Sequence, residues 1–342
     1  LLVYSIATAV TLMFAASALA LMTAGLLVSL LALPVNPKII AVVVLIATAV
    51  FLVLGQYRAL ERITKVLVLI MVLCTLVATL LVLPKLPVAS SLTLFPADMD
   101  IAGYLFLAAL IGWMPIPLDA AVTQSFWSRA KAENSDKPPT PQEVRFDFNV
   151  GFVGTVFLAL CFVAMGAGLI YGNNIELQSS SEGFSTQLIA LYSGLFGSWV
   201  TPIVGGAAIA IIYSSLLAIM DAYPRILENL YRRWQNIPET GDAHAHVSEK
   251  SLPYVGVLIF MVTSAMLIYL FFVSSLHSLI DLAATIAFVA APFFAWFNYR
   301  AMTADTVPLP LQPGKYFRIY SLACIGVLAL CSVLYLYLRF LV

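Results

Sequence analysis

The residues best suited to ion chemistry lie in one apolar run, residues 101–128. At about 1.5 Å per residue, a straight helix of this length would exceed the roughly 30 Å hydrocarbon layer of a bilayer. Its middle carries Gly112, Pro115 and Pro117. Because proline has no N–H and its ring clashes with the carbonyl four residues earlier, Pro115 deprives the carbonyl of Ile111 of its helical partner. The pattern predicts an interrupted helix whose freed carbonyl must face protein, water or an ion.

Two side chains beside these prolines could bind or conduct a cation. Met114 carries a thioether, a soft ligand that favours transition metals over Mg²⁺ or Ca²⁺. Asp119 is an ionisable group inside an apolar run, where a charge is costly and therefore indicates an ion pathway. The alternatives are an ordinary proline kink and a methionine that only packs, since the chain has 10 methionines. The combination of freed carbonyl, thioether and acid favours a cation site.

The composition is that of a helical membrane protein. Of the 342 residues, 62% are hydrophobic and only 10% charged, with a mean hydropathy of +1.00, whereas soluble domains have about 25% charged residues. The 17 basic and 17 acidic residues cancel, which argues against a nucleic-acid partner. Stretches with almost no charge predict an all-α polytopic protein with about nine transmembrane helices. These spans are 3–33, 38–54, 62–84, 101–128, 147–171, 199–224, 252–275, 279–299 and 317–341.

Charge in the loops predicts how the spans are oriented. Most of the 17 basic residues fall after the second, fourth, sixth and eighth spans, and this bias places those loops in the cytoplasm. The two longest such loops are 129–146 and 225–251. We expect residues 1–342 to form a single transmembrane domain in a bacterial inner membrane. The chain opens on Leu1 without a signal-peptide pattern, so we also expect its N-terminal part to be missing.

Other polar residues near the spans have simpler interpretations. Asp281 either caps the start of its helix near the outer surface or lines the ion pathway. Asp221 precedes Arg225 by four residues, the spacing of an ion pair on a helix. Tyr335 belongs to the last span, which we expect to be peripheral and to face lipid.

Three segments of the sequence resemble the Nramp family of divalent-metal transporters. Residues 112–117 (Gly-Trp-Met-Pro-Ile-Pro) resemble that family's unwound sixth helix, which is built around a Met-Pro-His motif. Residues 55–68 are similar to the family's Gly-x-Tyr-x-x-Leu-Glu-x-x-x-Lys segment before its fifth helix. Residues 205–218 resemble its eighth helix, which is rich in small residues. The resemblance covers the whole chain as helices three to eleven of an eleven-helix pattern.

This resemblance implies a fold and a ligand set. The fold is the LeuT-like inverted-repeat transporter fold, incomplete at the N-terminus. Met114 matches the family's metal-binding methionine, and Ile111 matches the position whose carbonyl completes the site. The family's other ligands belong to an Asp-Pro-Gly-Asn motif on a first helix that this sequence lacks. The histidine that follows Met-Pro in the family is replaced here by Ile116.

The resulting hypothesis is a membrane transporter for divalent metal ions of the Mn²⁺ or Fe²⁺ type. The metal is its substrate, H⁺ is a candidate second substrate, the bilayer is its environment, and no cofactor is expected. Two alternatives remain: a transporter of amino acids or other small solutes with the same superfamily fold, and a non-transporting membrane subunit. No constellation typical of an enzyme is found in the spans.

Overall fold

The computed structural model describes residues 2–54, 57–86, 100–114, 118, 120–133, 139–170, 178, 180–235, 252–269 and 276–340. Every regular element in these ranges is a helix. The α-helices are α1 (Leu2–Leu31), α2 (Pro37–Val53), α3 (Tyr57–Val82), α4 (Ile101–Trp113), α5 (Ala120–Glu133), α6 (Pro141–Met165), α7 (Ser181–Phe196), α8 (Thr201–Trp234), α9 (Leu252–Leu267), α10 (Leu276–Met302) and α11 (Lys315–Phe340). Short helical turns are η1 (Leu83–Lys85), η2 (Gly166–Ile170, of π type), η4 (Ser198–Val200) and η7 (Leu309–Leu311).

Local capping explains where several of these helices begin. At α2, the Asn36 side chain accepts a hydrogen bond of 2.9 Å from the Lys38 N–H, and Pro37 occupies the first helical position. At α6, Thr140 and Glu143 form a reciprocal capping box. At both starts, side-chain oxygens accept from N–H groups that have no partner within the helix, and the proline at the first helical position has no N–H to satisfy.

Within the described residues, five helices are long and apolar enough to cross a membrane, judged on length and composition. They are Thr8–Leu31, Pro141–Gly168, Ser198–Arg232, Leu276–Met302 and Lys315–Phe340. Three shorter apolar helices, Pro37–Val53, Val68–Val82 and Leu252–Leu267, coincide with further predicted spans. The total of nine spans stays a prediction.

The helices also occupy parts of the predicted loops. Helix α8 contains Pro224 and continues to Trp234, although the sequence predicted a loop over 225–251. Residues 236–251 of that loop lie outside the described residues. The predicted loop 129–146 contains the end of α5 and the start of α6, and its residues 134–138 also lie outside the described residues. Hydrophobicity marks the apolar part of a helix and misses its polar extension.

Helix α7 has no counterpart among the predicted spans. Ser180 caps its start by accepting a hydrogen bond of 3.1 Å from the Gly183 N–H. Gly197, with φ of 91°, ends it in a conformation that favours glycine. The helix mixes serine, glutamine and glycine with apolar residues, so its hydropathy is too low for a predicted span.

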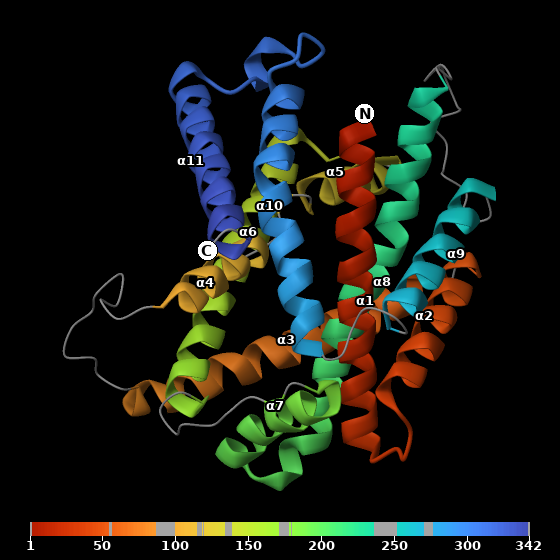
Figure 1. Cartoon of the computed structure of the whole chain (residues 1–342), viewed down its shortest axis with the longest axis vertical. Coiled ribbons are helices and arrows are strands. Elements are labelled where there is room, and N and C mark those ends of the chain that lie inside the picture. The colour runs from red at the N-terminus through yellow and green to blue at the C-terminus, as the bar shows by residue number, and fades with distance from the viewer. Residues whose placement is uncertain are drawn as a thin grey trace. The chain divides into compact units, whose positions relative to one another are not determined.

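The chain forms two compact units, each described by itself. In the unit of residues 12–90 and 139–280, α3 packs against α6 and α8, and α8 packs against α7 and α9. Helix α2 lies beside α9 (Figure 1). The core of this unit contains Ala78, Val82, Met165, Tyr192, Val200, Val204 and Ala207. The Tyr192 hydroxyl, buried in that core, forms a hydrogen bond of 3.2 Å with Thr75 Oγ1.

A glycine on α1 allows this helix to approach α7 in the same unit. A Cβ atom built on Gly25 would lie 2.4 Å from the Ser181 backbone oxygen, so only glycine fits there without movement. One turn further along, Ser29 Oγ and Thr186 Oγ1 form a hydrogen bond of 2.8 Å. Leu26 of α1 is buried in a small cluster with Ile189 and Ala208.

The other unit comprises residues 1–11, 91–138 and 281–342, and it contains α4, α5, α11 and most of α10. Helices α10 and α11 lie side by side (Figure 1), joined by a hydrogen bond of 3.3 Å from Ser332 Oγ to the Phe288 carbonyl. The rings of Phe288 and Tyr335 pack edge to face, with centroids 5.6 Å apart. Helix α11 also packs against α4.

Candidate metal site at the end of helix α4

Helix α4 carries the candidate metal ligands Ile111 and Met114. The Asp100 side chain caps its start by accepting a hydrogen bond of 2.8 Å from the Gly103 N–H. Its sequence, Ile-Ala-Gly-Tyr-Leu-Phe-Leu-Ala-Ala-Leu-Ile-Gly-Trp, is apolar on all faces, as expected for a helix surrounded by other helices or lipid. The helix therefore has no polar face of its own before it reaches Met114.

The helix ends at Trp113, directly before Met114. The Met114 N–H donates the last helical hydrogen bond, of 2.8 Å, to the Leu110 carbonyl. Met114 itself has an extended backbone, with φ of −101° and ψ of 136°, and a half-buried side chain. Its thioether is thus held where the chain leaves the helix.

The backbone of Ile111 lies in the last turn of α4, and its side chain is 58% exposed. A helical hydrogen bond to its carbonyl would have to come from residue 115, which is a proline and has no N–H. Gly112, also predicted to take part in the break, lies in the same last turn. The Ile111 carbonyl and the Met114 thioether therefore belong to one helix end.

Three residues of the predicted break lie outside the described residues, namely Pro115, Pro117 and Asp119. The next described helix, α5, begins at Ala120 and runs to Glu133. Two separate helices thus occupy the predicted span 101–128, and the conformation that joins them stays a prediction.

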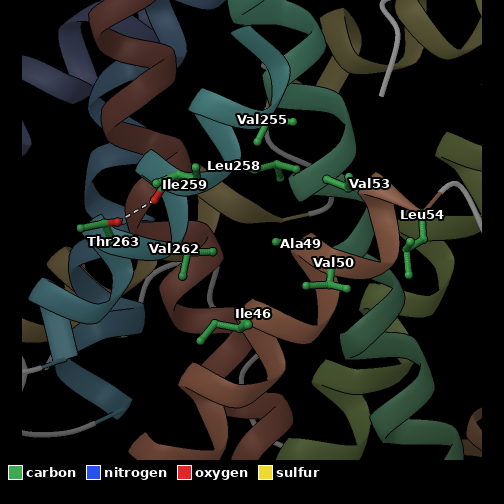
Figure 2. A pocket seen from close by; sticks show the side chains of 10 residues that line it. All are labelled: Ile46, Ala49, Val50, Val53, Leu54, Val255, Leu258, Ile259, Val262 and Thr263. Carbon is green, nitrogen blue, oxygen red and sulfur yellow. Dashed lines mark hydrogen bonds between the residues drawn. The ribbon is translucent and has the colours of Figure 1, made fainter. Parts of the chain in front are cut away.

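No other metal centre is evident in the part of the chain that the structure describes. There, no three His, Cys, Asp or Glu side chains come together closely enough to hold a metal ion. A pocket lies between α2 and α9 and is lined by Ile46, Ala49, Val50, Val53, Leu54, Val255, Leu258, Ile259, Val262 and Thr263 (Figure 2). Its one hydroxyl, on Thr263, donates a bond of 2.7 Å to the Ile259 carbonyl. This apolar pocket offers a cation no charged ligand.

Asp281 is part of a polar network between α10 and α11. Arg339 donates hydrogen bonds of 2.9 Å to Asp281 Oδ2 and to Thr285 Oγ1, and a further bond to the Tyr335 hydroxyl. Thr285 and Tyr335 also bond to each other, at 2.7 Å. Because α10 begins at Leu276, Asp281 lies within the helix, and the capping role suggested by the sequence is wrong. Its place in an ion pathway stays a prediction.

The sequence interpretation missed two residues of this network, Arg339 and Tyr335. Tyr335 is 2% exposed, so the expectation that it faces lipid is wrong, although most of α11 is exposed in the structure. Arg339 is the basic partner of Asp281. Both charges lie in predicted spans and near the same membrane face, and isolated charges in such spans usually pair. That rule could have predicted the pair, whereas the contacts of Tyr335 depend on the rotation of α11.

A second polar cluster lies on α8. Arg225 forms an ion pair of 2.7 Å with Asp221, which confirms the pair predicted from their spacing. The Tyr254 hydroxyl of α9 donates a bond of 3.1 Å to the same carboxylate. Further along α8, Arg232 pairs at 2.7 Å with Glu228, whose side chain is 1% exposed. These buried acids are neutralised by neighbours on the same helix.

These features define an all-α integral membrane protein in which an apolar helix ends beside a soft potential ligand. Residues 1–338 match the family model for natural resistance-associated macrophage protein-like proteins, called Nramp. The chain therefore belongs to the Nramp family. This confirms the resemblance found in the sequence, together with the LeuT-like polytopic fold that the family implies.

A curated protein of Pasteurella multocida (strain Pm70) is also similar to this chain. It is named uncharacterized protein PM0681 and is 26% identical over 288 residues. The match covers 82% of this chain and 63% of the relative. The chain thus spans about 63% of the length of the curated relative that it matches.

Proposed function

We propose that this protein transports divalent metal ions of the Mn²⁺ or Fe²⁺ type across a bacterial inner membrane. The metal is the transported substrate, and the proposal includes no resident cofactor and no enzymatic reaction. Membership of the Nramp family supports divalent-metal transport in general. The observation that carries the proposal is the end of α4 at Trp113, which leaves the half-buried Met114 thioether beside the last turn of that helix.

The ligand chemistry supports a transition metal over Mg²⁺ or Ca²⁺. In the proposal, the Met114 sulfur is the soft ligand and the Ile111 carbonyl is a hard ligand. Oxygen ligands alone suit Mg²⁺ and Ca²⁺, whereas a thioether contributes little to binding these hard ions. A site with both kinds of ligand therefore favours transition metals over Mg²⁺ and Ca²⁺ through its sulfur.

We further propose that Asp119 serves the ion pathway and that H⁺ is a second substrate. A titratable carboxyl five residues after Met114, in an apolar run, could exchange a proton as the metal passes. The Ile116 side chain cannot do so, although the family motif has a histidine there.

The test is metal uptake into proteoliposomes by the full chain and by Met114→Ala, with Mn²⁺ and Mg²⁺ measured separately. We expect Mn²⁺ uptake at limiting concentration to fall about tenfold, which corresponds to about 1.4 kcal/mol of binding energy. Mg²⁺ uptake should change by less than about twofold, because the thioether contributes little to a hard ion. The matched control is Met302→Ala, which removes an exposed thioether at the end of α10 and should leave both rates unchanged.

Equal losses of Mn²⁺ and Mg²⁺ uptake in Met114→Ala would mean that Met114 only packs against its neighbours. A wild-type chain that moves neither metal would instead contradict the proposed function itself. That result would favour the small-solute transporter or the non-transporting subunit.

A further inference from the structure

Helix α10 contains a proline in its interior, Pro292. Because proline has no N–H, residue 292 cannot donate to the carbonyl four residues earlier, which belongs to Phe288. Phe288 is 2% exposed, so bulk water has little access to that carbonyl. A buried carbonyl without a donor is unfavourable, and native structures usually provide one. The donor at this point of α10 has to come from outside the helical ladder.

A side chain of α11 supplies that donor. Ser332 Oγ donates a hydrogen bond of 3.3 Å to the Phe288 carbonyl. The Ser332 residue is 5% exposed, as is Ser264 on α9, but the hydroxyl of Ser264 bonds within its own helix, to the Met261 carbonyl at 3.0 Å. The hydroxyl of Ser332 instead bonds to another helix, at the carbonyl that Pro292 cannot serve.

Further contacts from α11 continue along α10 on the N-terminal side of Pro292. The Tyr335 hydroxyl and Thr285 Oγ1 form a hydrogen bond of 2.7 Å. Arg339 pairs with Asp281 at 2.9 Å. Together with the serine bond, these contacts recur at intervals of three and four residues on both helices, so they lie along one face of each helix. Helix α11 therefore holds α10 from Asp281 up to the proline, and the two helices lie side by side (Figure 1).

Helix α11 also packs against α4, the helix that ends beside Met114. Residues 281–302 of α10, all of α11 and all of α4 belong to the same compact unit. Sharp bends in helices occur mostly at prolines and a few other features, because the hydrogen-bond ladder is interrupted there. A change in the bend at Pro292 would therefore displace α11, which contacts the helix of the candidate metal ligands.

We propose that Pro292 is a bending point of α10 used during transport and that α11 braces it, with Ser332 supplying the hydrogen bond that Pro292 cannot donate. The segment of α10 from Asp281 to Pro292 moves together with α11, since the contacts described above join them. The bending role rests on the proposed function. The brace, meaning the Ser332 bond to the Phe288 carbonyl, is independent of transport.

The brace is tested by melting temperatures of the full chain with Ser332→Ala, Pro292→Ala and both substitutions. Ser332→Ala removes the donor of a buried carbonyl and should lower the melting temperature by about 3 °C. In Pro292→Ala, residue 292 regains an N–H for the Phe288 carbonyl, so the serine substitution should then cost about 1 °C or less. The matched control is Ser264→Ala, whose cost should be the same with proline or alanine at position 292.

The bending role is tested by Mn²⁺ uptake into proteoliposomes by Pro292→Ala. An uninterrupted helix bends less easily, so we expect uptake to fall about fivefold or more. The melting temperature of the same variant should be unchanged or higher, because alanine is the better helix former. The matched control is Pro253→Ala, since Pro253 lies in the first turn of α9, where no helical N–H is needed, and its uptake should stay at the wild-type rate.

Equal costs of Ser332→Ala in the two backgrounds would overturn the brace. Wild-type uptake in Pro292→Ala, or a loss of uptake accompanied by a lower melting temperature, would overturn the bending role. A wild-type chain that moves no Mn²⁺ would contradict the proposed function and the bending role with it. The melting temperatures still decide the brace in that case, because they do not depend on transport.

Discussion

The contact between α1 and α7 at Gly25 makes a quantitative prediction about stability. In Gly25→Ala, the new methyl carbon would lie 2.4 Å from the Ser181 carbonyl oxygen and 2.6 Å from the Ser181 carbonyl carbon. Carbon atoms pack favourably at about 3.5–4.0 Å, so the two helices must separate by about 1 Å. Both atoms are backbone atoms, and no side-chain rotation can relieve the overlap.

Overpacking of this kind costs about 1–3 kcal/mol, and we expect the upper end because the backbone itself must move. Alanine recovers about 1 kcal/mol, since it is the better helix former. The net expectation is a loss of about 2 kcal/mol in the free energy of unfolding. Separating α1 from α7 would also loosen the hydrogen bond between Ser29 and Thr186 and the packing of Leu26.

The assay is thermal unfolding of the purified protein in detergent, with Gly206→Ala as the matched control. Gly206 lies within α8, and a Cβ atom there would meet no atom within 4 Å. The same substitution should therefore be neutral or stabilising by up to about 1 kcal/mol at that position. If Gly25→Ala is as stable as Gly206→Ala, then α1 and α7 do not approach as closely as the structure describes.

Two further predictions concern the polar contacts. Arg339→Met should lower the free energy of unfolding by about 1–2 kcal/mol in the same assay, because it leaves Asp281 without its cation. Asp281→Asn should cost less, since the amide oxygen still accepts from the guanidinium, and equal losses would contradict this account. Tyr254→Phe should cost about 1.5–3 kcal/mol, because its hydroxyl donates to the buried carboxylate of Asp221. Tyr213→Phe is the control, because the Tyr213 hydroxyl makes only a weaker contact, a bond of 3.3 Å with Thr48 Oγ1. A similar loss of stability in both variants would show that the bond to the Asp221 carboxylate is not the cause.

The sequence was most informative where local chemistry alone determines the structure. Pro115 cannot donate a helical hydrogen bond in any fold, and α4 ends at Trp113, two residues before it. The spacing of Asp221 and Arg225 likewise predicted their ion pair, because residues four apart are neighbours on every α-helix. The role of Met114 as a ligand stays a prediction, since it depends on which groups meet the thioether.

Hydropathy was less informative for helices that carry polar residues. It did not predict α7, whose serine and glutamine residues lower the average, or the extension of α8 beyond Pro224. The last span was also expected to face lipid because it is rich in tyrosine, and Tyr335 is instead buried. Residue types alone do not show which face of such a helix is buried.

The sequence by itself indicated an all-α membrane protein that resembles the Nramp family, to which the chain belongs, and it predicted an interrupted helix beside Met114. Composition, proline chemistry and short motifs are local properties, and they hold however the helices pack. Only the tertiary structure decided that Gly25 lies against Ser181, that Arg339 reaches Asp281, and that Ser332 donates to the Phe288 carbonyl. These contacts depend on the rotation and crossing of whole helices, which are set by packing between residues far apart in the chain.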